Sequence, residues 1–215
     1  MPYVSRDMKP AIVTICLVTV ACASGGERVQ QPAVPQTNTA AEAPHQHVHD
    51  SELPATPGHG FTVADVRFMQ NMIGHHAQAI RMAAFAPSHG ASEKVRQLAQ
   101  KIDISQRDEI GMMKKWLSDR HQIAPTDTQS HAMMMPGMLN AEQLAQLDAA
   151  RGTEFDRLFL SYMIRHHEGA LQMVEELFKA PGAGQDSDIF RFATDVDADQ
   201  RDEIFVMQKL LDAIR

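Results

Sequence analysis

Two pairs of adjacent histidines are the side chains of this sequence best suited to chemistry. Each pair follows a methionine at close spacing, which gives two sets: Met72, His75 and His76, and Met163, His166 and His167. Residues three or four apart share a face of a helix, so each set would place a thioether beside imidazoles. Thioether and imidazole ligands together favour Cu(I) and, less selectively, Cu(II) or zinc. The spacing therefore indicates a metal site for copper, with Cu(I) favoured and another transition metal as the alternative.

A methionine-rich stretch between the two pairs forms a second candidate site. Its candidate ligands are His131, Met133, Met134, Met135 and Met138. The Pro136-Gly137 dipeptide predicts a loop, and a loop with several thioethers can surround a soft cation. The alternative is that Met135 and Met138 fill the end of a helical core.

Both histidine pairs lie inside an internal duplication. Residues 68–82 match residues 159–173 at an offset of 91, and residues 106–110 match residues 200–204 at an offset of 94. Each unit has the periodicity of two helices joined by a turn. The expected segments are repeat units at about 61–122 and 152–215 and a methionine-rich connector at 123–151.

Caps and breakers define the expected helix ends. Thr62 and Thr153 each begin a Thr-x-x-Asp pattern that is close to a capping box, and Pro or Pro-Gly follows several helices. The expected long helices are 62–86, 92–124, 153–179 and 186–214, with a short bridging helix at 140–150. These lengths predict an all-α four-helix bundle built from two duplicated helix pairs, which a pseudo-two-fold axis should relate.

Polar residues fall on the helix faces that should point inward. The seam of the first helix is Phe68, Met72, His75, Ala79 and Met82, and the third helix repeats it with Phe159, Met163, His166, Ala170 and Met173. The inner stripes of the second and fourth helices contain or border Gln106 and Glu109, and Gln200 and Glu203. Since an unpaired buried polar group costs about 1–3 kcal/mol, this duplicated set needs a role.

Two interpretations of this polar face stay open. In the first, the four histidines bind metal together with the seam methionines Met72, Met82, Met163 and Met173. The residues that would support these ligands are Asp65, Asp156, Gln106, Gln200, Glu109 and Glu203. In the second, the polar groups only bond to one another, with Asp65 and Asp156 as helix caps. The bonds expected then are His75 to Glu203 or Gln200, and His166 to Glu109 or Gln106.

The N-terminal residues predict export. Lys9 precedes an apolar run at Ala11–Val20 that is too short to span a bilayer. Residues 18–22 resemble a bacterial lipobox, which makes Cys22 the expected lipidation site. We therefore expect a signal peptide at 1–22, with its natural start at Met8, and a plain cleaved signal is the alternative.

Residues 23–60 predict a disordered tether rather than a folded segment. They contain five prolines and no helical or strand period. Their histidines, which could collect a metal loosely, are His45, His47, His49 and His59. The folded domain is accordingly expected at 61–215.

Composition and missing motifs exclude several functions. The chain has 20 Lys and Arg against 27 Asp and Glu, a net charge of −7, which argues against a general nucleic-acid binder. Two cysteines cannot build a disulfide scaffold or a zinc ribbon. The sequence lacks the metalloprotease, haem-attachment, nucleophile-elbow and phosphate-loop motifs, and its Glu-x-x-His lies in the tether at 42–45. No catalytic residues are predicted.

These motifs resemble those of the bacterial domain of unknown function 305. The resemblance covers about residues 60–215 and rests on Met72-Ile-x-His-His76, Met163-Ile-x-His-His-Glu-Gly-Ala-x-x-Met173, Pro136-Gly-Met138 and Gly152-x-x-Phe-Asp156. It implies a ferritin-like four-helix bundle. Because members are often exported and some are associated with copper binding and tolerance, it also implies a copper-binding role.

Residues and resemblance together predict an exported protein that binds copper and buffers it or passes it on. It should be lipid-anchored on the periplasmic side of the cell envelope. Its expected partners are the metal ion, the membrane through the anchor, and a second copy or a copper-delivery protein, but not nucleic acid. Two alternatives stay open: a structural or partner-binding module whose polar seam only fixes packing, and a ferritin-like metal-dependent oxidoreductase.

Overall fold

The computed structural model describes residues 60–126 and 134–214, and within these ranges the chain is all-α, as the sequence predicts. Its helices are α1 (Val63–Ala83), α2 (Glu93–Asp119), α4 (Ala141–Ala149), α5 (Gly152–Lys179) and α6 (Ser187–Asp212). No helix in the described ranges is long and apolar enough to cross a membrane. The predicted signal peptide, Cys22 and the tether up to residue 59 lie outside the described residues.

Side-chain caps explain where several helices begin. Thr62 and Asp65 form the predicted capping box of α1, in which the Thr62 N–H donates to the Asp65 carboxylate at 2.7 Å. Asn140 forms a second box with Gln143 at the start of α4. Asp186 accepts the Ile189 N–H at 3.1 Å at the start of α6. A cap of this kind stabilises a helix by about 1 kcal/mol.

One predicted cap and two predicted helix ends are wrong. No capping box forms at Thr153, because α5 begins one residue earlier and Asp156 bonds elsewhere. The second helix ends at Asp119, well before Pro125, since His121 takes a left-handed backbone conformation (φ 54°) that stops the helix. The first helix gives way to turns after Ala83.

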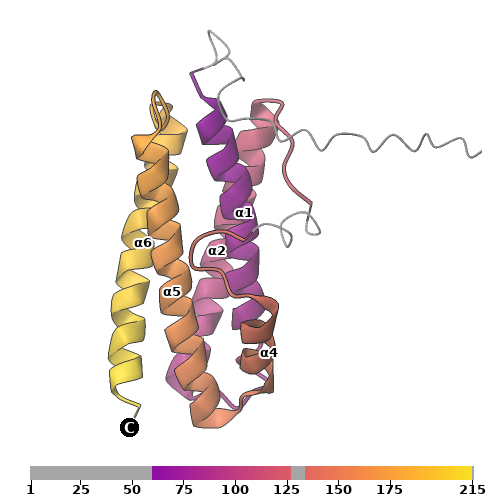
Figure 1. Ribbon diagram of the computed structural model, residues 1–215, viewed down its shortest axis with the longest axis vertical. Coiled ribbons are helices and arrows are strands. Elements are labelled where there is room, and N and C mark those ends of the chain that lie inside the picture. Colours follow the sequence, from indigo (N-terminus) through magenta and orange to yellow (C-terminus); the bar gives the residue numbers. More distant parts are fainter. Residues whose placement is uncertain (1–59, 127–133, 215) are drawn as a thin grey trace, which may run out of the picture. The chain divides into compact units, whose positions relative to one another are not determined.

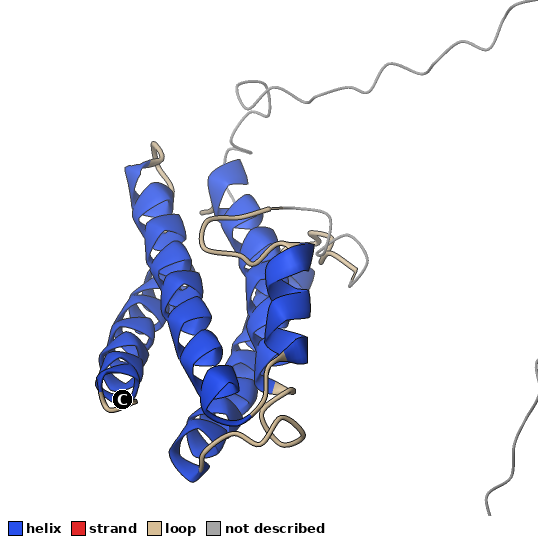
Figure 2. Cartoon of the chain, turned by 60° about the horizontal axis from the view of Figure 1, so that its bottom comes forward, coloured by secondary structure: helices blue, strands red, loops and turns tan. Residues whose placement is uncertain are grey.

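The four long helices lie side by side (Figure 1). Helix α1 packs on α2 and α5 on α6, and a contact between α1 and α5 joins the two duplicated pairs. Helix α4 lies on the outside of the long helices (Figure 2), and its contact with α5 is as sparse as the contact between α2 and α6. The two pairs therefore meet mainly through the two helices that carry the histidines.

Each helix pair also completes a turn of the other pair. Asp65 of α1 accepts the N–H of Gly184, in the turn between α5 and α6, at 2.7 Å. Asp156 of α5 accepts the N–H of Ser92, the residue before α2, at 3.1 Å. Because Asp65 and Asp156 are equivalent in the duplication, the two bonds are reciprocal.

The core consists of two apolar clusters separated by polar side chains. The Phe155 cluster includes Ala79, Met82, Phe155, Phe159 and Met163. The Trp116 cluster includes Met72, Trp116, Ala170, Met173 and Phe192. Along α1 and α5, each histidine pair follows a residue of one cluster and precedes a residue of the other. The buried polar residues between the clusters, here called the polar layer, are His75, His76, Gln106, Glu109, His166, His167, Gln200 and Glu203.

Candidate metal centre

The four histidines of the polar layer are completely buried, each with 0% of its surface exposed. The rings of His75 and His166 approach each other most closely, with centroids 3.8 Å apart across the α1–α5 contact. The adjacent rings lie further apart, at 6.5 Å for His75 and His76 and 6.2 Å for His166 and His167. The duplication thus places two imidazoles in the centre and one on either side of them.

The outer imidazoles bond to carboxylates within their own helix pair. His76 Nε2 lies 2.5 Å from Glu109 Oε2, and His167 Nε2 lies 2.8 Å from Glu203 Oε2. The predicted bonds from His75 and His166 to the other helix pair are therefore wrong. The second histidine of each pair, not the first, faces the neighbouring glutamate, because adjacent side chains on a helix point about 100° apart.

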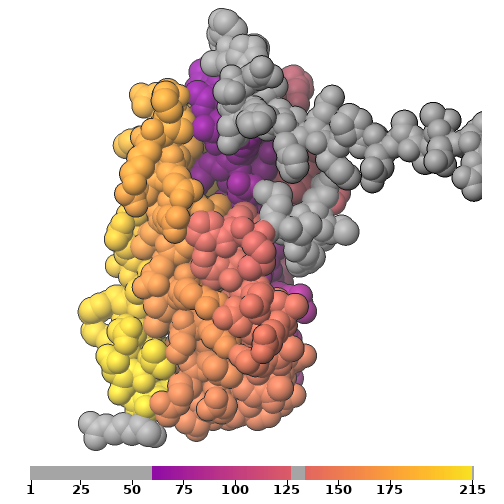
Figure 3. Space-filling view, viewed as in Figure 1, coloured from indigo at the N-terminus to yellow at the C-terminus, as the bar shows by residue number. Residues whose placement is uncertain are grey.

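The central imidazoles meet the connector instead. His75 Nε2 lies 2.9 Å from the carbonyl oxygen of Pro136. The Gln78 side chain, one turn further along α1, bonds to both backbone polar groups of Leu139, at 2.7 and 3.0 Å. On α5, Gly169 leaves the space that the Pro136–Gly137 backbone occupies. The connector consequently lies over the long helices on the face shown in Figure 3, and its Pro136 carbonyl reaches His75.

Each of the four imidazoles retains a buried ring nitrogen with no hydrogen-bond partner among the described residues. These atoms are the Nδ1 atoms of His75, His76 and His167 and both ring nitrogens of His166. In a neutral imidazole whose Nε2 donates to Pro136, Glu109 or Glu203, Nδ1 carries a free lone pair. A buried polar atom without a partner costs about 1–3 kcal/mol, so these five atoms in one layer are unfavourable if the layer serves packing alone. They fit the requirement of a metal ion for neutral imidazole.

Burial also keeps the central imidazoles neutral. It lowers the pKa of His75 from 6.5 to about 3, with a further contribution from His76. Burial, followed by His75 and His167, likewise holds the pKa of His166 well below 6.5. On Glu203, burial favours the protonated form, but the hydrogen bond from His167, the positive charge of that imidazole when protonated, and the charge of Lys101 outweigh it and lower the pKa. The centre can thus offer uncharged imidazoles flanked by carboxylate.

The seam methionines lie on both sides of the polar layer. Met72 and Met163 each lie three residues before the first histidine of their helix, and both are fully buried, in the Trp116 and Phe155 clusters respectively. Met82 and Met173 each lie seven residues after that histidine and belong to the opposite clusters, Phe155 for Met82 and Trp116 for Met173. Each histidine-bearing helix therefore places one thioether about one turn before its first histidine and a second one about two turns after it.

The connector methionines are placed unevenly. Met138 is buried, Met135 is half-buried and Met134 is exposed, while His131 and Met133 lie outside the described residues. Within the described ranges, no three His, Cys, Asp or Glu side chains are close enough together to hold a metal by themselves. A metal in the polar layer would therefore need methionine sulfur among its ligands, or would be held by only one or two His, Cys, Asp or Glu side chains.

The carboxylates predicted to support the ligands divide into two kinds. Glu109 and Glu203 are in a position to do so through their bonds to His76 and His167. Asp65 and Asp156 are not, because each lies ten residues before the first histidine of its helix, about 15 Å at 1.5 Å per residue. These two serve the helix starts and turns described above.

The two glutamines of the polar layer are still candidates for residues that support the metal ligands. Gln106 and Gln200 are 1% and 3% exposed. Both amide atoms of Gln106 and the amide oxygen of Gln200 have no hydrogen-bond partner in the part of the chain that the structure describes. They add to the unpartnered polar atoms of the layer.

Sequence reasoning missed three contributors to the site. They are the Pro136 carbonyl, the Gln78 side chain, and Lys101, whose Nζ lies 3.5 Å from Glu203 Oε1. Gln78 could have been predicted, because its equivalent in the duplication is Gly169. A long polar side chain on the first helix therefore corresponds to a residue without a side chain on the other. The role of the Pro136 carbonyl could not have been predicted, because every residue has a backbone carbonyl and a sequence pattern does not show which one faces a histidine.

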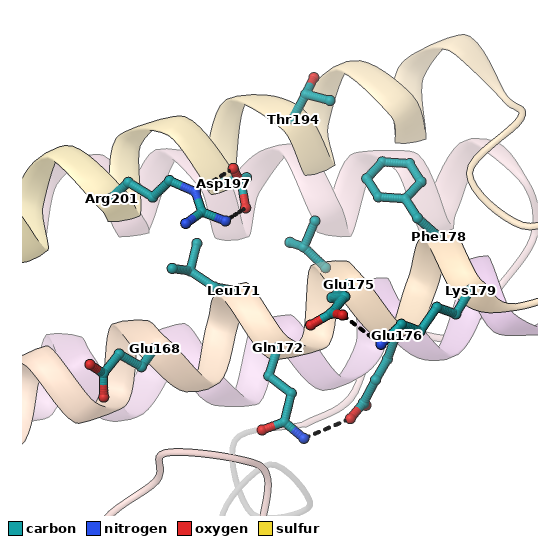
Figure 4. Close-up of a pocket in the computed structure, with 11 residues that line it drawn as sticks. Glu168, Leu171, Gln172, Glu175, Glu176, Phe178, Lys179, Thr194, Asp197 and Arg201 are labelled. Atoms are coloured by element: carbon teal, nitrogen blue, oxygen red, sulfur yellow. Dashed lines mark hydrogen bonds and ion pairs between the residues drawn. The ribbon is translucent and has the colours of Figure 1, made fainter.

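A surface pocket between α5 and α6 does not offer a comparable set of candidate metal ligands. It measures about 950 Å³ and lies between the outer faces of α5 and α6 (Figure 4). Its polar side chains bond mainly to one another: Glu175 with Lys179, Gln172 with Glu176, and Asp197 with Arg201. Most of its charges are therefore already compensated.

Comparison with known proteins agrees with this architecture. The family described as domain of unknown function (DUF305) matches residues 65–211. No curated protein matches the chain. A DUF305 fragment from Deinococcus radiodurans is 31% identical, with a TM-score of 0.63 over 71% of this chain and 98% of that one.

Two further solved structures are similar. A DUF305 protein from Streptomyces coelicolor, described as a candidate secreted protein, is 27% identical, with a TM-score of 0.62 over 70% of this chain and 93% of that one. CopM in its Cu(I)-bound form is also 27% identical, with a TM-score of 0.54 over 67% of this chain and 93% of that one. The family match spans most of the helical region, including both histidine pairs, and the chain belongs to the DUF305 family.

Proposed function

We propose that this protein is an exported copper-binding protein that buffers copper or passes it on in the cell envelope. The observation that carries the proposal is the set of buried imidazoles whose ring nitrogens have no partner among the described residues. The similarity to CopM, which is known in Cu(I)-bound and Cu(II)-bound forms, supports copper as the ion.

The residues best suited to hold copper are the two central histidines and their flanking methionines. His75 and His166 bring their rings to 3.8 Å, and Met72 and Met163 precede them by one helical turn. Uncharged imidazole and thioether are the donors that Cu(I) prefers. Glu109 and Glu203 would orient the outer imidazoles and compensate the charge of the ion.

Export and anchoring are part of the proposal. The apolar run before Cys22 and the lipobox-like residues 18–22 support a lipid anchor on the periplasmic side. The similarity to a candidate secreted protein supports a location outside the cytoplasm. Such a protein would meet copper in an oxidising compartment, where thioethers do not form disulfides.

The test is a thermal melt of residues 23–215 with and without Cu(I) under anaerobic, reducing conditions. Because copper would bind only the folded chain, saturating Cu(I) should raise the melting temperature. Replacement of the central pair, His75→Leu with His166→Leu, should abolish this rise and weaken Cu(I) binding at least tenfold, about 1.4 kcal/mol.

His89→Leu is the matched control. His89 is also buried, at 5% exposure, but it bonds to Asp148 outside the polar layer. This variant should lose stability and keep the Cu(I)-induced rise. A wild-type melt that ignores saturating Cu(I) would refute the proposal.

One observation favours a purely structural role. The bonds of His76 and His167 to Glu109 and Glu203 tie α1 to α2 and α5 to α6 without any metal. In that case the central variant would lower stability, and Cu(I) would leave the wild-type melt unchanged.

A further inference from the structure

A groove between α2 and α6 leads from the surface to the polar layer. It measures about 520 Å³, and its lining includes Met69, Glu109, Met112, Asp195, Val196 and Asp199. It forms where α2 and α6 touch only sparsely. The groove therefore exposes one flank of the layer.

Glu109 connects this groove to the histidines. Its side chain lines the groove and at the same time lies 2.5 Å from His76 Nε2. His76 is fully buried, and its Nδ1 has no partner among the described residues. A cation that reached Glu109 would consequently be one side chain away from an unpartnered imidazole nitrogen.

The charges around the two histidine–glutamate pairs differ although the pairs are duplicated. The offset of 94 that relates Glu109 to Glu203 also relates Lys101 to Asp195 and Ser105 to Asp199. Lys101 Nζ lies 3.5 Å from Glu203. Glu109 instead shares its groove with the carboxylates of Asp195 and Asp199.

The electrostatics of Asp199 agree with this placement. Partial burial, then Glu109 and Glu203, raise the pKa of Asp199 above its ordinary value, against a smaller opposing effect of the charge of Lys101. The carboxylates thus lie near enough to repel one another, and a cation between them would relieve that repulsion.

The basic residues of the groove lie toward its other end. Lys115 is ion-paired with Asp119, and Arg120 with Asp186, each at 2.8 Å. Arg191 precedes Asp195 by one helical turn, on the side away from Asp199. The end beside Glu109, Asp195 and Asp199 is therefore the acidic part.

We infer that this groove is the entrance through which copper ions reach the polar layer, and that Lys101 closes the equivalent approach over Glu203. The inference rests on the proposed function. Asp195, Asp199 and Glu109 attract the cation, and the thioethers of Met69 and Met112 offer a soft ion further contacts in the groove. Copper then enters from the His76 side of the layer.

The test compares rates of Cu(I) uptake by residues 23–215. Cu(I) in anaerobic acetonitrile-containing buffer is mixed rapidly with the protein, and quenching of Trp116, the only tryptophan, is followed. Trp116 lines the same groove. Asp195→Asn with Asp199→Asn should lower the association rate constant about fivefold or more, within the range of electrostatic steering.

The matched control is Asp103→Asn with Asp197→Asn. These aspartates are equivalent in the duplication, lie on the same two helices, and pair with Arg107 and Arg201 outside the groove. The net charge changes equally, so this control should slow uptake less than about twofold if local placement matters. Equal slowing of both double variants, or slowing of neither, would overturn the entrance.

Lys101→Asp tests whether Lys101 blocks the access of copper ions to Glu203. It should speed uptake about twofold or more and should restore the rate of the Asp195/Asp199 variant. The amount of Cu(I) bound at saturation should stay the same in all variants, and a loss of bound copper in the Asp195/Asp199 variant would make these residues ligands and overturn the inference. A wild-type chain that binds no Cu(I) would instead refute the proposed function before any rates are compared.

Discussion

The protonation of single imidazoles determines what the polar layer can do. His75 and His166 remain neutral, with lowered pKa values, because the surrounding protein does not solvate a positive charge and neighbouring histidines oppose a second one. Neutral rings keep the lone pairs that a metal needs. The same burial makes the metal-free chain sensitive to acid.

The free energy of unfolding of the metal-free chain should fall on acidification. His75 has a pKa of about 3 in the folded chain and 6.5 as its ordinary value. The unfolded chain therefore binds more protons below pH 6.5, so stability is complete above that pH and is lost as pH falls from about 6.5 toward about 3. His75 and His166 should each contribute up to about 1.4 kcal/mol per pH unit in this window. Urea unfolding at about pH 7.5 and about pH 5.5, with a chelator present, measures the loss.

The variant that carries His75→Leu and His166→Leu supplies the comparison. Leucine does not titrate, so the variant should lose much less stability between the two pH values. The same pH dependence in both proteins would contradict the assignment.

The sequence located the histidines but not their partners. The duplication marked both pairs, and their spacing from Met72 and Met163 identified the inner face. Which ring of each pair faces a glutamate depends on the rotation of the helix and on the side-chain rotamer, and a pattern does not resolve either. The angle of about 100° between neighbours was enough to place His76 and His167, for which no bond was predicted, beside the glutamates in place of His75 and His166.

At the scale of elements, the connector is held against the helices by two different devices. On α1, Gln78 bonds to the backbone of Leu139. On α5, the equivalent residue Gly169 admits the backbone of Pro136 and Gly137. The duplicated helices have thus diverged so that one loop fits both.

Gly169→Ala should destabilise the chain. A methyl group at this position would overlap the backbone of Pro136 and Gly137, so the connector must shift. The expected loss is about 1–3 kcal/mol, as for other overpacked sites. Urea unfolding measures it.

Gly111→Ala is the control, because a methyl group on that glycine of α2 meets nothing within 4 Å. Alanine should stabilise the helix there by about 0.5–1 kcal/mol. A Gly169→Ala variant as stable as the wild type would show that the connector does not press on α5.

Helix positions were predictable because caps and prolines act locally. The starts of α1 and α4 agree with the sequence to about one residue. The failure at Thr153 has a long-range cause, since Asp156 bonds to Ser92 on the other helix pair. A pattern of four residues contains no information about such a partner.

At the scale of the whole molecule, the reciprocal bonds of Asp65 and Asp156 make the two helix pairs depend on each other. Each pair lacks a partner for one of its turns when it is alone. It also leaves the apolar faces of its histidine-bearing helix uncovered. Stability should therefore belong to the two pairs together.

Separate fragments of residues 60–122 and 139–214 should each be mostly unfolded at micromolar concentration. Mixed in equal amounts, they should regain helical circular dichroism, because each then covers the apolar face of the other. A fragment that melts cooperatively alone would contradict this dependence. The intact chain, melted under the same conditions, is the reference.

The duplication makes Lys101 and Asp195 equivalent positions, and the difference between these two residues bears on the origin of the domain. Two separate copies of one helix pair, assembled as a homodimer, would carry the same residue at both positions, since every substitution in a homodimer is made twice. Only after the copies were fused into one chain could one acquire a lysine and the other an aspartate. Different charges over Glu109 and Glu203 are therefore open to a fused chain and not to a homodimer of one helix pair.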